Sequence, residues 1–190
     1  MPKFTQKEKE VIFSKLRTSG EELFAKYGLK KVTVDDIAER VGIGKGTFYH
    51  FYSNKEHLFM DIFNRAQEEI FEDIDAFLQK DGTGREKALS LVRYLLCKFK
   101  EHPILSTVSG EDFELLQCKV PEECLLQNDI DDKELLLKAE ASGMVLRYPP
   151  EIVTKTVRGI FIIANAYQED KDGCEVVDIL SQAVVNYLVE

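Results

Sequence analysis

The chain of 190 residues has no tryptophan, only three histidines and four cysteines, and no long apolar run. Its longest apolar stretch, residues 159–164, is far shorter than the roughly 18 residues needed to cross a membrane. The N-terminus lacks the apolar segment of a secretory signal, so we expect a cytoplasmic protein without a membrane partner. Because 44% of the residues are apolar, the chain is expected to build a core rather than to stay disordered.

The sparse histidines and cysteines also argue against metal or acid–base chemistry. Cys97, Cys118, Cys124 and Cys174 form no C-x-x-C pair, so we interpret them as reduced thiols on or near helix cores, with redox sensing as the alternative. The sequence contains no G-x-S-x-G, H-E-x-x-H or P-loop motif. We therefore predict that the chain is not an enzyme and needs no metal and no cofactor.

The charge of the chain is divided unevenly. The net charge is −9, which by itself disfavours nucleic acid as a partner. Residues 1–57, however, hold 11 basic and 8 acidic side chains, a net charge of +3, whereas residues 58–190 hold 14 and 26, a net charge of −12. A basic beginning suits DNA, and an acidic remainder would turn that end toward the duplex.

Residues 33–58 are the most informative stretch, because they predict two short helices around a tight turn and the start of a third. Thr33 suits an N-cap, and Gly42 suits a helix end that needs positive φ. This spacing is typical of a helix-turn-helix, whose second helix enters the major groove of DNA. The apolar residues expected to pack its helices together are Val34, Ile37, Ala38, Val41, Ile43 and Phe48.

The apolar periodicity elsewhere predicts an all-α protein of about nine helices. We expect a three-helix DNA-binding domain at residues 1–52, with its recognition helix at about 44–50, and a helical effector-binding and dimerisation domain at 53–190. Gly20 would let the recognition helix approach the first helix, and Ser53 would cap the helix after the motif. The other expected helices cover residues 6–27, 54–80, 84–102, 103–109, 121–141, 151–168 and 174–188.

The chain from about residue 11 to residue 60 resembles the TetR family of bacterial transcriptional repressors. The resemblance implies a repressor that binds a palindromic DNA operator as a homodimer and leaves it when a small-molecule effector binds. A non-enzymatic architectural or protein-interaction module that uses the same motif without ligand control is the alternative. The matching segments, in order and with the expected gaps, are Phe24–Gly28, Thr33–Ala38, Gly42–Tyr49 and Lys55–Leu58.

The resemblance also implies which residues contact DNA. Lys45 and Thr47 would face base edges at the tip of the recognition helix, whereas Lys55 would bind a phosphate. Tyr52 or His50 would replace the phosphate contact that the family usually makes at position 51. Gly44 would leave the recognition helix without a side-chain cap. The implied DNA-binding residues are Thr33, Gly44, Lys45, Gly46, Thr47, Tyr49, His50 and Lys55.

The last two expected helices are apolar on more than one face, which indicates either deep burial or an interface. We favour pairing with the same helices of a second subunit over a simple domain core. The residues expected at that dimer interface are Val157, Ile160, Phe161, Ala164, Leu180, Val184 and Leu188.

An effector pocket is expected where the helices of residues 53–190, the body of the chain, converge, although the same aromatic residues would equally fill an ordinary core. Its expected lining residues are Tyr94, Phe99, Phe113, Leu116, Phe161 and Tyr167.

Overall fold

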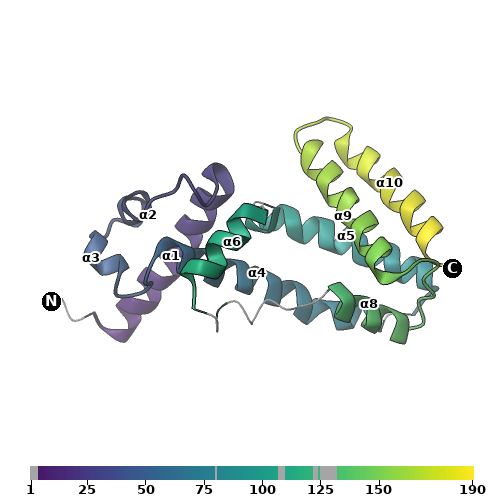
Figure 1. Ribbon diagram of the computed structural model, residues 1–190, viewed down its shortest axis with the longest axis horizontal. Coiled ribbons are helices and arrows are strands. Elements are labelled where there is room, and N and C mark those ends of the chain that lie inside the picture. Colours follow the sequence, from purple (N-terminus) through teal and green to yellow (C-terminus); the bar gives the residue numbers. More distant parts are fainter. Residues whose placement is uncertain (1–3, 80, 107–109, 122–123, 125–131) are drawn as a thin grey trace. The chain divides into compact units, whose positions relative to one another are not determined.

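The computed structural model describes residues 4–79, 81–106, 110–121, 124 and 132–190 (Figure 1). In these residues the chain is helical, and its only β-pairing is an isolated bridge between Leu146 and Val189. The predicted all-α class is thereby confirmed. The helices of the described part are α1 (Gln6–Tyr27), α2 (Val34–Val41), α3 (Lys45–Phe48), α4 (Lys55–Leu78), α5 (Gly84–Glu101), the 3₁₀ helix η1 (Pro103–Ser106), α6 (Gly110–Lys119), α8 (Asp132–Ala141), α9 (Pro150–Ala166) and α10 (Gly173–Leu188).

The chain forms two compact units, and helix α4 contributes residues to both. The first unit comprises Met1–Gln67 and His102–Asp129, and the second comprises Glu68–Glu101 and Ile130–Glu190. The first unit therefore contains the helix-turn-helix together with the start of α4 and helix α6. A domain boundary at residue 52 stays a prediction.

Aromatic side chains form the centre of the first unit's core. Phe24 on α1, Phe48 on α3 and Phe59 on α4 are each at most 1% exposed. The rings of Phe24 and Phe59 meet edge to face, with their centroids 5.1 Å apart. Burying such rings is the largest source of stability that a small unit has, so α1, α3 and α4 hold one another in place.

Gly20 sits where α1 crosses α4. A Cβ atom built on Gly20 would lie 3.0 Å from the Ile62 Cδ1 and 3.0 Å from the Leu58 Cδ2, both on α4. The absence of a side chain therefore permits this close crossing. The expectation that Gly20 serves the recognition helix is wrong, because its neighbour is α4.

The predicted boundaries agree with the structure for most long helices. The expected helix at residues 6–27 is confirmed without change, and α4, α5, α9 and α10 begin and end within two residues of expectation. The recognition helix is shorter than expected, since α3 spans Lys45–Phe48. Residues 107–109, 122–123 and 125–131, which belong to two further expected helices, lie outside the described residues.

The start of α4 is capped by a different residue from the one predicted. Asn54 Oδ1 accepts a hydrogen bond of 2.7 Å from the backbone N–H of His57, so Asn54 rather than Ser53 caps the helix. Glu56, three positions after Ser53, is 3% exposed and accepts a hydrogen bond of 3.0 Å from Lys119 Nζ.

In the second unit, α9 and α10 lie side by side and pack on α5 (Figure 1). Arg93 on α5 binds Asp178 on α10 at 2.7 Å, and Arg85 Nε donates to the carbonyl of Val189 at 2.9 Å. No helix of the described part has both the length and the apolarity to cross a membrane.

The structure describes all four cysteines, and none of them forms a disulfide. The prediction that they lie on or near helix cores is wrong for Cys97, Cys118 and Cys174, which are exposed. Cys124 is half-buried beside the core of the first unit.

We predict that Gly20→Val lowers the free energy of unfolding by about 1–3 kcal/mol, because its branched side chain would force α1 away from α4. Urea unfolding followed by circular dichroism measures the change. Ser14→Val, at an exposed position of the same helix, is the matched control. Equal stability losses in the two variants would show that the crossing at Gly20 is not tight.

Candidate nucleic-acid interface

Helix α2 begins at a complete capping box. The Thr33 hydroxyl accepts from the backbone N–H of Asp36 at 3.2 Å and donates to the Asp36 carboxylate at 2.6 Å. The backbone N–H of Thr33 donates to the same carboxylate at 2.8 Å. These hydrogen bonds from Thr33 lower the pKa of Asp36. Thr33 thus has a structural role as the N-cap, and a phosphate contact by this residue stays a prediction.

The turn after α2 and the start of α3 use glycine for different reasons. Gly42 ends α2 with φ of +77°, a conformation that L side chains rarely adopt. Gly44 caps α3 with no side-chain hydrogen bond, as its sequence predicts. A Cβ atom on Gly46 would meet nothing within 4 Å. The backbone at the tip of α3 is therefore open to another molecule.

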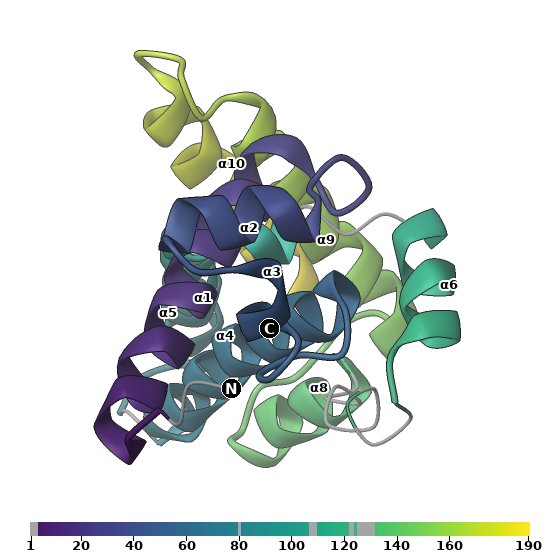
Figure 2. The same cartoon turned by 90° about the vertical axis from the view of Figure 1, so that its left-hand side faces the viewer.

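Helix α3 lies beside α2 (Figure 2). It buries one of its residues, and the others are exposed or half-buried. Phe48 is fully buried in the core of the first unit. Lys45, Tyr49 and His50 are exposed, and Thr47 is half-buried. The structure therefore leaves the predicted base-facing tip of α3 uncovered, as DNA binding requires.

The side chain of Lys45 makes an exposed ion pair. Its ammonium lies 2.7 Å from the carboxylate of Asp35 on α2, and the two side chains are 52% and 67% exposed. The hydrogen bond to Asp35 raises the pKa of Lys45, which keeps this side chain charged. Because an exposed pair contributes little to stability, DNA acceptors can replace Asp35 at small cost.

Lys55 lies in a different environment. Its Nζ donates to three backbone carbonyls of the loop between α1 and α2, those of Leu29 at 2.8 Å, Lys30 at 3.3 Å and Val32 at 2.6 Å. Burial lowers the pKa of Lys55. A phosphate contact by Lys55 stays a prediction.

Tyr52 cannot replace the phosphate contact that the family usually makes at position 51, because its side chain is only 2% exposed. Its hydroxyl donates to Asp61 Oδ2 on α4 at 2.5 Å, and Arg17 on α1 binds both oxygens of that carboxylate at 2.6 and 2.7 Å. The ring of Tyr52 stacks on Phe13, with the centroids 5.4 Å apart. This network of Arg17, Tyr52 and Asp61 joins α1, the end of the α3 segment and α4. Tyr52 is buried, whereas the side chains of Arg17 and Asp61 are 27% and 23% exposed.

Sequence reasoning missed Arg17 and Asp61. They are 44 positions apart, so no local spacing relates them. The one available signal was Tyr52, whose hydroxyl needs a partner once the side chain is buried.

The protonation states of Arg17, Tyr52 and Asp61 depend on one another. Desolvation raises the pKa of Asp61, but the hydrogen bonds from Arg17 and Tyr52 lower it more, so the net shift is downward. Desolvation and the hydrogen bond to Asp61 raise the pKa of Tyr52, which stays a donor. An aspartate whose pKa is lower in the folded state adds stability above its unfolded pKa, and that stability is lost as pH falls through the folded value.

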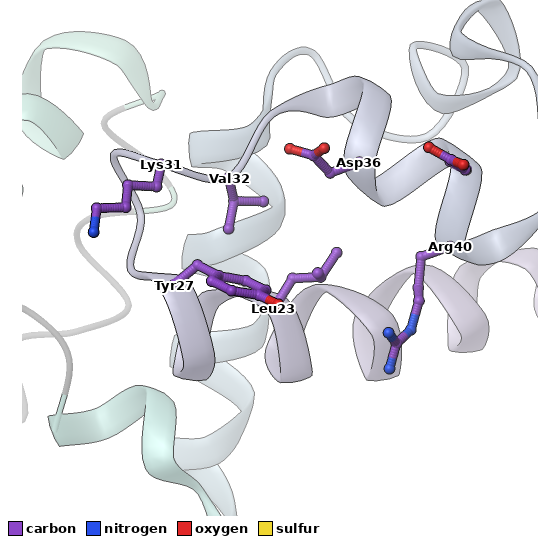
Figure 3. Close-up of a pocket in the computed structure, with 7 residues that line it drawn as sticks. Leu23, Tyr27, Lys31, Val32, Asp36 and Arg40 are labelled. Atoms are coloured by element: carbon purple, nitrogen blue, oxygen red, sulfur yellow. The ribbon is translucent and has the colours of Figure 1, made fainter.

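A cavity of about 500 Å³ lies in the first unit, between α1 and α2. Figure 3 shows Leu23 and Tyr27 of α1 facing Val32 and Asp36 across it. Lys31, Glu39 and Arg40 complete the lining, so none of the residues predicted for the effector pocket contributes. In the described residues no group of three His, Cys, Asp or Glu side chains is placed to hold a metal ion.

The residues predicted for the effector pocket belong to both units. Leu116 is buried in the core of the first unit, and the side chain of Phe113 lies outside the described residues. In the second unit, the ring centroids of Phe99 and Phe161 are 4.6 Å apart, whereas Tyr167 is 42% exposed. The Tyr94 hydroxyl, also in that unit, donates to Asp73 at 2.8 Å.

Of the residues predicted for the dimer interface, Val157, Phe161, Ala164, Leu180 and Val184 are half-buried, and the interface stays a prediction. Ile160 and Leu188, two of the predicted residues, are 2% and 4% exposed and belong to the core of their own unit. The periodicity could not separate the two faces, because both helices carry apolar residues on several sides. The most exposed large apolar side chains of these helices are Ile152, Ile162, Ile179 and Tyr187, at 47%, 72%, 58% and 63%.

Comparisons with known proteins agree with this arrangement. Residues 16–62 match the model of the family described as bacterial regulatory proteins, tetR family. The chain is 29% identical over 92 residues to the uncharacterized HTH-type transcriptional regulator YhgD of Bacillus subtilis (strain 168). This match spans 48% of each chain, so it covers about half of the relative's length.

Other matches extend beyond the helix-turn-helix region. The chain is 25% identical over 151 residues to the probable acrEF/envCD operon repressor of Escherichia coli (strain K12), which covers 64% of this chain and 69% of the relative. The crystal structure of a TetR family transcription regulator from Marinobacter aquaeolei VT8 is similar with a TM-score of 0.72 at 17% identity, over 98% of this chain and 100% of that chain. This last likeness shows the fold.

We predict that Asp61→Asn destabilises the protein by about 2 kcal/mol at pH 7, because the neutral amide cannot bind Arg17 and Tyr52 as the carboxylate does. As pH falls below about 4, the ordinary pKa of aspartate, and through the lower folded pKa, the parent should lose this contribution, so the difference between the proteins should shrink. Urea unfolding at a series of pH values measures it. Asp35→Asn, which removes an exposed ion pair, is the control. An equally large loss of stability in that variant would contradict the role of the network of Arg17, Tyr52 and Asp61.

Proposed function

We propose that the chain, which belongs to the TetR family of bacterial regulatory proteins, is a transcriptional repressor that binds a palindromic DNA operator as a homodimer. A small-molecule effector would release it from the operator. The single observation that carries the proposal is the uncovered tip of α3, held from below by the fully buried Phe48.

The exposed groups of the tip match what DNA offers. Lys45 provides a charged donor for base acceptors or phosphates, and the hydroxyls of Thr47 and Tyr49 can donate or accept. His50 lies beside them in sequence and is exposed. Gly44 and Gly46 have no side chain, and a Cβ on either would meet nothing within 4 Å. The backbone can therefore approach a phosphate or a base edge closely.

A homodimer would follow from the open faces of α9 and α10. Ile162 and Ile179 are the most exposed isoleucines of the described part. A Cβ on Gly159 would meet nothing within 4 Å, so the helix of a second copy can approach α9 at that point. Two copies would place two recognition helices on half-sites one helical turn, or a multiple, apart. The second contact then becomes intramolecular, which raises the affinity without new contacts.

Repression and effector control rest on different support. The Escherichia coli relative is named a probable operon repressor, which favours repression for this chain. Effector control would need a ligand site among the body's helices, where the half-buried rings of Phe99 and Phe161 meet. A molecule that binds one arrangement of the dimer better than another would shift the protein away from DNA.

We predict that Lys45→Ala changes the DNA sequence that the protein prefers, because it removes a donor at the base-facing tip. Selection of random DNA duplexes with each purified protein measures the preference, and a base pair read by Lys45 should lose about 1–3 kcal/mol of discrimination. Lys171→Ala, at an exposed position far along the chain, removes the same charge and is the control.

Two outcomes of that selection would contradict the proposal. If both variants prefer the parent's sequence with the parent's affinity, the tip of α3 does not read DNA. If the parent enriches only A·T-rich or bent DNA and no palindrome, the protein is an architectural module instead of an operator-binding regulator.

We predict that Ile162→Glu weakens dimerisation at least about tenfold, since it would bury an unpaired carboxylate between two copies. Analytical ultracentrifugation over a range of protein concentrations measures the monomer–dimer equilibrium. Val145→Glu replaces an apolar side chain that is 54% exposed but lies outside α9 and α10, and it should leave the equilibrium unchanged. Dimers of equal stability in both variants would place the interface elsewhere.

A further inference from the structure

Lys55, the first residue of α4, directs its ammonium into the loop between α1 and α2. Nζ lies 2.6 Å from the Val32 oxygen, 2.8 Å from the Leu29 oxygen and 3.3 Å from the Lys30 oxygen. A lysine ammonium has three N–H donors and no acceptor, so each donor has a carbonyl partner. A DNA phosphate could bind this group only by displacing one of the three carbonyls.

The loop that Lys55 holds is anchored in the core of the first unit. The side chains of Leu29 and Val32 are 3% and 2% exposed and belong to the main apolar cluster. Their carbonyls, which Lys55 binds, are therefore close to the interior, where a hydrogen bond from a charged donor stabilises more than it does in water. The downward shift of the Lys55 pKa through burial agrees with an ammonium turned toward the protein.

The same loop determines where α2 begins. Thr33, the N-cap of α2, directly follows Val32. Gly42 then ends α2, and α3 begins three residues later at Lys45. Fixing the loop against the start of α4 consequently fixes α2, and with it the uncovered tip of α3.

We infer that Lys55 is a positioning residue that ties the loop between α1 and α2 to the start of α4 through three backbone carbonyls, and that it is not a ligand of DNA phosphate. The inference deepens the proposed function, on which it rests for its second test only. Lys31 offers a matched control, because it is an exposed lysine in the same loop.

The first test needs no DNA. Lys55→Met keeps an unbranched side chain and removes the ammonium, so hydrogen exchange of the backbone amides at residues 29–36 should become at least about tenfold faster. Lys31→Met should exchange as the parent does. Unchanged exchange in a folded Lys55→Met protein would overturn the inference. Should Lys55→Met fail to fold, Lys55→Arg decides, because the longer planar guanidinium keeps the charge but does not fit three convergent carbonyls.

The second test measures how operator affinity depends on salt. For a positioning role, Lys55→Arg should bind the operator about tenfold more weakly than the parent, with the same slope of log affinity against log salt concentration. A phosphate ligand predicts the opposite, because arginine binds phosphate at least as well as lysine does. In that case Lys55→Met would also reduce the slope by about 0.9 per subunit. If the parent itself binds no DNA, the proposed function fails, while the exchange measurement still decides the role of Lys55.

Discussion

A helix of four residues such as α3 has no stability of its own, because the first helical turn fixes several residues for a single hydrogen bond. Its position must therefore come from tertiary contacts. Phe48 supplies one of them by filling the core between α1 and α4, and Tyr52 supplies another through its hydrogen bond to Asp61. Helix α3 is in this sense a surface of the first unit's core.

Chemically similar residues of the first unit lie in different surroundings. Lys45 and Lys55 are both lysines that the resemblance assigns to DNA. Lys45 is held by one exposed carboxylate, which DNA can replace, whereas Lys55 is held by three carbonyls at the core. A side chain that positions the backbone and a side chain that reads DNA cannot be told apart by residue type. They differ in what surrounds the charged group.

The second unit shows a related division between inside and outside. Helices α9 and α10 are apolar on several sides, which is the composition of helices that pack both within a chain and against another chain. One side of each packs in the unit, where Ile160 and Leu188 are buried. The other side exposes Ile162 and Ile179, and these large apolar side chains in water favour a partner.

The amino-acid sequence by itself determined the features that depend on neighbouring residues. It indicated the all-α class, the helix at residues 6–27, the N-cap at Thr33 and the turn at Gly42, because caps, turns and apolar periods involve residues a few positions apart. The order and spacing of the motif segments likewise indicated the family. A segment of the sequence is enough to recognise each of these features.

Only the tertiary structure decided which distant residues meet. It brought Arg17 to Asp61, Gly20 to α4 and Lys55 to the loop at Leu29–Val32, and it selected which face of α9 and α10 stays open. These contacts join positions far apart in sequence, and they depend on shape and on competition for burial among all the side chains of a unit. No local pattern of residue types carries that information.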